Sequence, residues 1–124
     1  MTLDLHGTVA LIAGAASPTG AAMARELARL GATVAILDGD RAGLDDLAAA
    51  IEAAGGHVLS AAVDLTDPYS ARNAVGWVVS RCERLDIVIV AGAADPTASV
   101  SRAAIQHLRM AGHDSPRACA DLVA

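Results

Sequence analysis

The chain has 124 residues and a formal net charge of −5; 54% of its residues are hydrophobic and only 2% are aromatic. That length predicts a single domain with an aliphatic core. An acidic balance without any basic run argues against nucleic acids and anionic membrane surfaces as partners. No apolar run approaches the ~18 residues of a membrane span.

All nine basic residues other than histidine are arginines, so the sequence contains no lysine. These residues therefore cannot support a mechanism that needs a lysine ammonium or a Schiff base. The first residues contain neither a basic leader nor a long apolar stretch. Cys82 and Cys119 are too few for a disulfide framework, and we expect a reduced, cytoplasmic setting.

Short runs rich in Val and Ile predict four strands, over residues 8–13, 33–38, 58–63 and 86–91. Because these runs are apolar on both faces, they are typical of buried parallel strands. Helical spacing lies between them, in the stripes Met23/Leu27/Leu30, Leu44/Leu47/Ile51 and Val75/Val78/Val79/Cys82. A weaker fourth helix is predicted over residues 101–111. This alternation predicts an α/β domain with right-handed crossovers and a parallel sheet.

Capping residues support these helices. Asp40 and Asp67 are candidate N-caps, Pro68 suits a first helical position, and Gly31 and Gly55 are candidate stops. No internal linker or repeat divides the chain. We expect residues 1–112 to form the domain and residues 113–124, which have no clear pattern, to be a poorly structured tail.

A glycine-rich turn, Gly14-Ala15-Ala16-Ser17-Pro18-Thr19-Gly20, joins the first strand to the first helix. Phosphate-binding turns need small residues there, so that backbone N–H groups and the helix N-terminus can approach a pyrophosphate. Gly14 would permit the tight turn, and Gly20 would permit close packing of the helix on the strand. Two glycines six residues apart are a weak signal alone, but a strand precedes them and a helix follows.

Asp38 ends the second predicted strand, eighteen residues after Gly20. A carboxylate at this place can accept hydrogen bonds from a ribose diol and would repel a 2′-phosphate, which favours NAD over NADP. Alternatively, Asp38, Gly39 and Asp40 merely form the turn and cap the next helix. Asp40 fits the cap better, so we favour the ligand role for Asp38.

With these residues in view, the sequence resembles the short-chain dehydrogenase/reductase family. Residues 5–15 (LHGTVALIAGA) are similar to the family's opening strand, and residues 13–20 fall on its TGxxxGxG turn. The run VDLTD at residues 63–67 is similar to its D-[VL]-T-D element, and LDIVIVAG at residues 85–92 is similar to the strand that ends in Asn-Asn-Ala-Gly.

The resemblance implies a Rossmann-type sheet of about four strands in the order 3-2-1-4, incomplete relative to the family. It also implies an NAD site, in which Asp64 and Leu65 would border the adenine. The full set of cofactor-binding residues that we predict is Gly14, Ala16, Ser17, Pro18, Thr19, Gly20, Asp38, Asp64, Leu65, Ala91 and Gly92.

The departures from the family pattern concern the phosphates, the nicotinamide end and the catalytic half. Pro18 replaces the turn's middle glycine and contributes no N–H. Ile89 and Val90 replace the Asn-Asn pair. The family's serine and Tyr-x-x-x-Lys are missing, and Tyr69 is best interpreted as a surface residue at a helix start. We therefore predict no catalytic residue.

Other arrangements predict no further chemistry. The four histidines share no metal-ligand spacing, so we predict no metal site. Cys82 completes an apolar stripe and Trp77 is expected to be semi-buried. A phosphorelay receiver domain would need paired acids after the first strand and a lysine, and both are missing.

Three hypotheses follow. The first is an NAD-binding fragment of oxidoreductase lineage without independent turnover. The second is a pseudoenzyme or interaction subunit, in which the strand over residues 86–91 is an exposed sheet edge that pairs with a second copy or a complementing subunit. The third is a truncated gene product without function.

Overall fold

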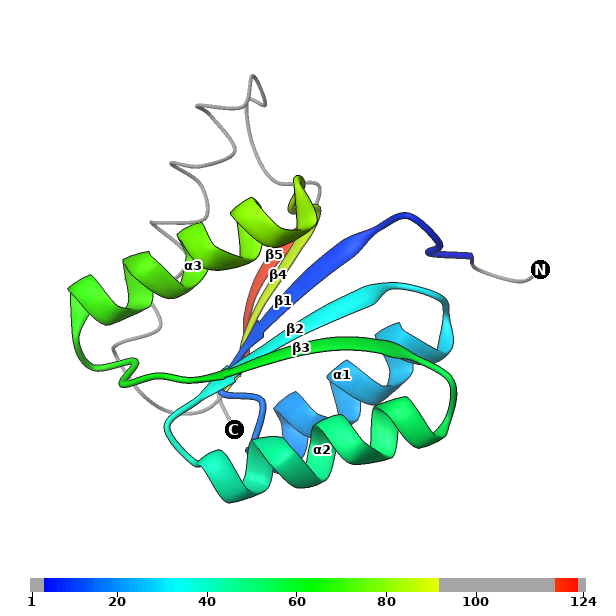
Figure 1. The fold of residues 1–124 in the computed structure, drawn as a ribbon, viewed down its shortest axis with the longest axis horizontal. Coiled ribbons are helices and arrows are strands. Elements are labelled where there is room, and N and C mark those ends of the chain that lie inside the picture. The colour runs from blue at the N-terminus through cyan, green and yellow to red at the C-terminus, as the bar shows by residue number, and fades with distance from the viewer. Residues whose placement is uncertain (1–3, 92–117, 123–124) are drawn as a thin grey trace.

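The computed structural model describes residues 4–91 and 118–122. Strands and helices alternate over residues 9–91, as predicted (Figure 1). They are β1 (Val9–Ala13), α1 (Pro18–Arg29), β2 (Thr33–Asp38), α2 (Arg41–Ala53), β3 (His57–Ala62), α3 (Pro68–Cys82), β4 (Ile87–Ala91) and β5 (Ala118–Leu122).

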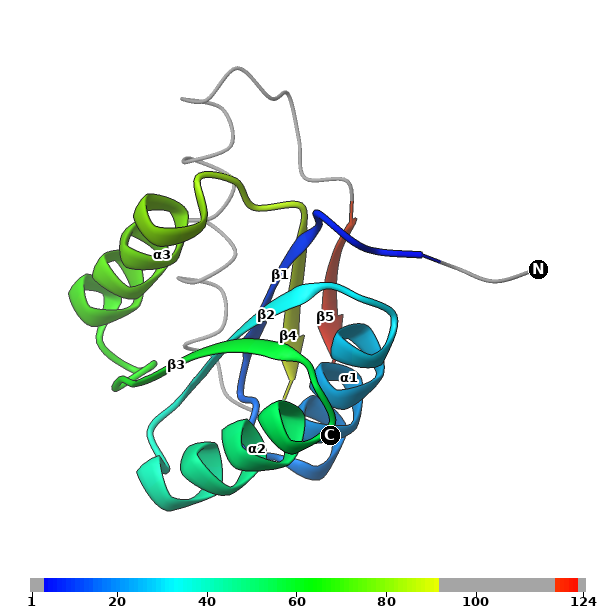
Figure 2. The same ribbon diagram turned by 45° about the vertical axis from the view of Figure 1, so that its right-hand side comes forward.

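The strands form one parallel sheet in the order β3-β2-β1-β4-β5. The α/β class, the parallel sheet and the order 3-2-1-4 of the first four strands are thereby confirmed. Helices α1 and α2 cover one face, and α3 covers the other (Figures 1 and 2). This layering is the Rossmann-type architecture that the family resemblance implied.

The fifth strand was not predicted. Ala118–Leu122 lies within the segment expected to be a poorly structured tail, yet it pairs in parallel with β4, Ile87 opposite Ala118 and Ala91 opposite Leu122. The physical reason is the edge of β4, whose backbone N–H and C=O groups need partners that a short run of small residues can supply. The expectation that β4 itself is an exposed edge is therefore wrong, because β5 covers it. The predicted boundary at residues 112/113 and the helix over residues 101–111 lie outside the described residues.

Caps set the helix starts. Ser17, Asp40 and Asp67 are the N-caps of the three helices, and proline occupies the first turn of α1 and α3. Gly31 and Gly55, the predicted stops, have φ values of +105° and +87°. No described helix is long and apolar enough to cross a membrane.

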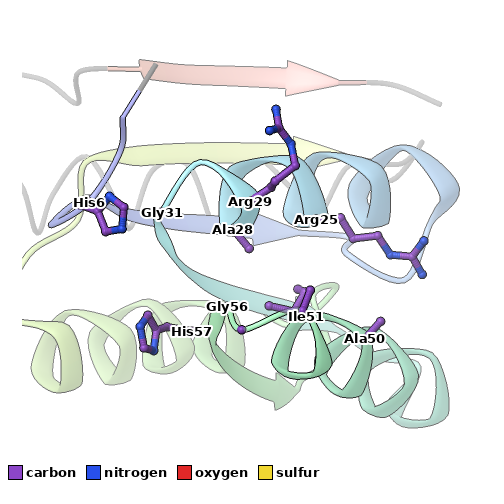
Figure 3. Close-up of a pocket in the computed structure, with 11 residues that line it drawn as sticks. His6, Arg25, Ala28, Arg29, Gly31, Ala50, Ile51, Gly56 and His57 are labelled. Carbon is purple, nitrogen blue, oxygen red and sulfur yellow. The ribbon is translucent and has the colours of Figure 1, made fainter. Parts of the chain in front are cut away.

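The face covered by α1 and α2 carries one of two apolar cores, to which alternate residues of the strands contribute. Ala10 and Ile12 of β1 and Ile36 of β2 pack there against Leu44 and Leu47 of α2. At the amino ends of the strands, the space between the C-terminal turns of α1 and α2 is left as a cavity of about 420 Å³ (Figure 3).

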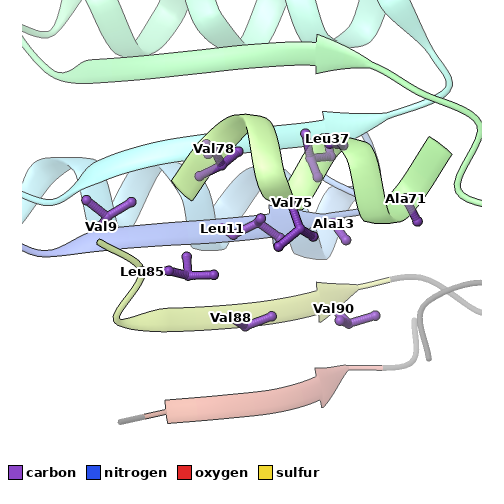
Figure 4. Close-up of a cluster of buried hydrophobic side chains, with 12 residues drawn as sticks. Val9, Leu11, Ala13, Leu37, Ala71, Val75, Val78, Leu85, Val88 and Val90 are labelled. Carbon is purple, nitrogen blue, oxygen red and sulfur yellow. The ribbon is translucent and has the colours of Figure 1, made fainter. Parts of the chain in front are cut away.

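The opposite face packs against α3 (Figure 4). Leu11 and Val88, both fully buried, meet Val75 and Val78 of the helix. Trp77 is half-buried against this core, as expected, and its ring lies 5.7 Å from the Arg81 guanidinium carbon. All five residues of β1 are buried because both faces of the sheet are covered.

Candidate functional site

The strand register brings four turns together at the carboxyl edge of the sheet. Ala13 pairs with Leu37 on one side and Val90 on the other, while Asp38 pairs with Ala62. The residues that follow these pairs therefore emerge at one edge, where ligands of open α/β sheets bind.

Glycine is required at two places in the turn after β1. Gly14 has a φ of +76°, and a Cβ atom there would lie 1.9 Å from the carbonyl oxygen of Ala91. A Cβ atom on Gly20 would lie 2.3 Å from the Gly14 carbonyl oxygen. The turn therefore lies directly against β4, and α1 lies directly against the turn.

Ser17 closes the turn onto α1. Its hydroxyl donates to the Gly14 carbonyl at 2.7 Å and accepts from the Gly20 N–H at 3.1 Å. The Ser17 N–H donates to the same Gly14 carbonyl at 3.1 Å. The hydroxyl is thus engaged in capping the helix, which limits its part in holding a ligand.

Most backbone donors of this turn are already used. The N–H groups of residues 14 and 15 donate to the Leu37 carbonyl, and those of residues 17 and 21 donate to carbonyls within the turn. The N–H groups of residues 16 and 20 donate to the side chains of Asp38 and Ser17. Pro18 has no N–H. Between residues 14 and 21, Thr19 therefore supplies the one N–H without a partner among the described residues, and it lies in the first turn of a helix.

Asp38 connects the turn to the end of β2. Its half-buried carboxylate accepts from the Ala16 N–H and from the Asp40 N–H, each at 3.0 Å. Asp40 caps α2, as predicted, by accepting from the Gly43 N–H at 3.1 Å. Each Asp38 oxygen has one further lone pair, so the carboxylate can hold the turn and still accept from a ligand.

Asp64 and Leu65 follow β3 at the same edge. The Asp64 carboxylate accepts from the Thr66 hydroxyl at 2.5 Å and the Thr66 N–H at 2.9 Å, and these two bonds lower the pKa of this exposed group. Leu65 packs against the α3 core and is half-buried. Gly92, the last of the predicted cofactor-binding residues, lies outside the described residues, whereas Ala91 is buried at the end of β4.

Three residues at or near the family's functional positions provide no acid–base pair within the part of the chain that the structure describes: Tyr69, Ile89 and Val90. Tyr69 is 75% exposed in the first turn of α3. Ile89 and Val90 are 5% and 1% exposed and contribute to the apolar cores. No group of three or more His, Cys, Asp or Glu residues within residues 4–91 and 118–122 is arranged to hold a metal ion.

One buried charge, Asp86, was not identified from the sequence, and it lies at the amino end of the strands. Asp86 is 5% exposed, accepts from the Val9 N–H at 2.9 Å and receives two bonds from Arg84, at 2.7 and 2.6 Å. The carboxylate raises the pKa of the Arg84 guanidinium. The Arg-x-Asp spacing before an apolar strand was the signal in the sequence. The Asp86 carboxylate joins the start of β4 to β1.

The sequence was also compared with protein families and with known proteins. The sequence model of the short chain dehydrogenase family matches residues 8–111, and the chain belongs to that family. An uncharacterized oxidoreductase of Methylorubrum extorquens is 33% identical over 106 residues, which are 85% of this chain and 43% of that protein. An uncharacterized NAD-dependent oxidoreductase of Mycobacterium tuberculosis is 36% identical over 99 residues and is covered to 36% of its length.

Among solved structures, a short-chain type dehydrogenase/reductase from Mycobacterium marinum superposes with a TM-score of 0.83 over 90% of this chain and 54% of that one. At 23% sequence identity, this likeness shows the fold. The chain thus spans less than half the length of these two curated relatives and about half of the solved neighbour.

Proposed function

We propose that these residues bind NAD at the carboxyl edge of the sheet, as the cofactor-binding part of an oxidoreductase. The observation that carries this proposal is the juxtaposition of the free Thr19 N–H with the Asp38 carboxylate, which is tied to the same turn through Ala16. The first group suits a pyrophosphate oxygen and the second suits a ribose diol. The tuberculosis relative, described as NAD-dependent, supports the choice of cofactor.

The residues fit an adenine dinucleotide in part. Gly14 and Gly20 let the turn pack closely against β4 and α1, and we propose that Asp64 and Leu65, which follow β3 at the same edge, border the adenine. Pro18 removes one donor and adds an exposed ring beside Thr19. We expect binding that is weaker than in a turn with glycine at that place.

The same residues are proposed to lack independent turnover. A bound NAD would supply the acceptor for a hydride, but a proton donor and acceptor must come from the protein. Ser17 caps a helix, Tyr69 is exposed on α3, and the sequence has no lysine to lower a tyrosine pKa. The catalytic groups would then come from outside these 124 residues, in a further segment or a second chain.

Calorimetric titration of the purified chain with NAD, and in parallel with NADP, tests the cofactor proposal. We expect saturable heat with NAD and weaker binding of NADP, because Asp38 would repel the 2′-phosphate. No heat at millimolar NAD would contradict the proposal. Absorbance at 340 nm with NAD and a panel of alcohols tests turnover, and steady NADH formation would contradict the proposed lack of it.

Light scattering after size-exclusion chromatography tests the need for a second chain. Within the described residues, β5 is the outer strand on its side of the sheet, and an outer strand has backbone groups that can pair with another chain. We expect a dimer or larger assembly. A monomer at all concentrations would contradict association through this edge.

A further inference from the structure

The cavity between α1 and α2 lies at the edge of the sheet opposite the proposed cofactor site. It is lined by the C-terminal turns of both helices and by residues that precede β1, β2 and β3 (Figure 3). Its volume of about 420 Å³ falls within the range of small-molecule sites. The lining residues are His6, Arg25, Ala28, Arg29, Gly31, Ala50, Ile51, Ala54, Gly55, Gly56 and His57.

Two glycines allow close packing in the wall of this cavity. A Cβ atom on Gly31 would lie 2.7 Å from Nδ1 of the His6 ring, and one on Gly56 would lie 2.7 Å from a methyl carbon of Ile51 and 3.3 Å from Cβ of Ala28. The glycines therefore let an imidazole and the apolar floor approach the backbone closely. The floor itself is formed by aliphatic side chains, with Ile51 at its centre.

Every charged or titratable side chain in the lining is basic, in a chain whose net charge is −5. Two of the four already have an acidic partner, since His6 contacts Asp4 and Arg29 pairs with Glu26. Arg25 and His57 have no such partner among the described residues. An arginine guanidinium is a fixed positive charge whose N–H groups can donate to an anion.

The two unpaired groups lie at opposite ends of the cavity. In Figure 3, Arg25 lies on one side of Ile51, and His6 and His57 lie on the other. The last turns of α1 and α2, whose carbonyl ends disfavour an anion, belong to the histidine end. A negative group is therefore best placed at the Arg25 end, with an apolar body extending over Ile51.

We propose that this cavity binds a small organic monocarboxylate, with its carboxylate on Arg25 and its apolar body over Ile51. Arginine suits this group because its planar fork donates two parallel bonds to a carboxylate. The proposal is independent of NAD binding, since it concerns other residues at the other edge of the sheet.

Benzoate is the probe for this site, and benzamide is its neutral counterpart of the same shape. Titration of the isotope-labelled chain, followed by NMR, should shift the amide signals of Gly31, Gly55 and Gly56 and the methyl signals of Ile51. For so small a ligand we expect a Kd on the order of 1 mM, so the titration extends to about 20 mM. Benzamide and inorganic phosphate should bind about tenfold more weakly or not at all, because one lacks the charge and the other the apolar body.

Arg25→Ala should weaken benzoate binding about tenfold or more, and Arg25→Lys should weaken it less. Both substitutions are at one exposed position on α1 and should leave the fold intact. Arg72→Ala removes an exposed arginine from α3 on the other face and is the matched control, with no effect expected. The proposal is overturned if these signals do not move by 20 mM benzoate, if benzamide or phosphate binds equally well, or if Arg25→Ala binds as the unmodified chain does.

Discussion

The carbonyl oxygen of Ala91 occupies the place where Gly14 would need room for a side chain, since a Cβ atom there would lie 1.9 Å from it. At Gly14, the turn after β1 lies against the backbone at the end of β4. Gly14 also has a φ of +76°, and its N–H donates to the Leu37 carbonyl of β2 at 2.9 Å. One residue therefore joins the carboxyl ends of three neighbouring strands.

Gly14→Ala should destabilise the domain strongly. The added methyl group overlaps a backbone atom that cannot rotate away, and the left-handed conformation disfavours any side chain. We expect a loss of at least about 3 kcal/mol of unfolding free energy. Urea denaturation followed by circular dichroism would measure it.

Gly7→Ala is the matched control for this substitution. Gly7 has a similar φ of +82°, but a Cβ atom there would meet nothing within 4 Å. Its cost should be limited to the left-handed conformation, about 1 kcal/mol. Equal losses of unfolding free energy in the two variants would show that the overlap with Ala91 does not add to the destabilisation.

The buried carboxylate of Asp86 provides a second stability test. Asp86→Asn removes the charge that pairs with Arg84 and leaves fewer acceptors for the two Arg84 bonds and the Val9 N–H. Because one partner of a buried pair is lost while the arginine is half-exposed, we expect a loss of about 2–3 kcal/mol.

Asp4→Asn is the control, since the contact of Asp4 with His6 is exposed on both sides. Exposed ion pairs contribute little to stability, so the urea midpoint should not change measurably. A midpoint for Asp86→Asn that matches the one for Asp4→Asn would contradict a stabilising role for the buried pair.

The sequence predicted those parts of the fold that depend on local pattern. Each of the first four strands was predicted to within one residue at either end, because a short apolar run rich in Val and Ile favours a buried strand. The caps Asp40 and Asp67 were identified because a carboxylate before a helix satisfies its free N–H groups.

Features that depend on tertiary pairing were not predicted. The short run at residues 118–122 has little strand character alone, and it becomes β5 because the edge of β4 offers it backbone partners. Asp86 looks like a strand-start residue in sequence, and only the register with Val9 explains its burial. The cavity beside His6 and His57 likewise depends on how α1 and α2 pack.

Replacement of Pro18 tests whether the turn binds phosphate, and it rests on the proposed NAD site. Pro18→Gly restores an N–H beside that of Thr19 and removes the ring, so NAD should bind about tenfold more tightly. Pro18→Ala restores the N–H and keeps a Cβ atom. Equal gains in the two variants would assign the effect to the missing donor, and a gain with glycine alone would assign it to the ring volume. Unchanged affinity in both would contradict a phosphate site at this turn.

Asp38→Asn separates the two roles open to that carboxylate. If Asp38 holds a ribose and repels a 2′-phosphate, the preference for NAD over NADP should fall about tenfold. Parallel calorimetric titrations with the two cofactors would measure that ratio. Stability should also fall, by about 1 kcal/mol, since Asn can less well accept from both the Ala16 and Asp40 N–H groups. If stability falls but the ratio of NAD to NADP affinity does not change, Asp38 only stabilises the turn and does not contact the cofactor.

Cys82 should make the stability of the domain depend on pH in the alkaline range. Burial against the α3 core raises the pKa of its thiol, and the nearby Arg81 only partly opposes this. The unfolded thiol, with a pKa of about 8.5, loses its proton first as the pH rises. The folded state then binds more protons than the unfolded one, so stability is full below the unfolded pKa and falls as the pH rises through the folded pKa.

Urea midpoints measured at pH 7 and pH 9.5 would reveal this decrease, and Cys82→Ala is the control because it removes the titrating group. We expect the midpoint to fall less between the two pH values in Cys82→Ala than in the unmodified chain. Alkylation by iodoacetamide, followed by mass spectrometry of the peptide that contains Cys82, should also be slower in the folded chain than in urea, because the thiolate is the reactive form. Equal rates in both states, with the same pH response in the alanine variant, would mean that burial does not hold this thiol protonated.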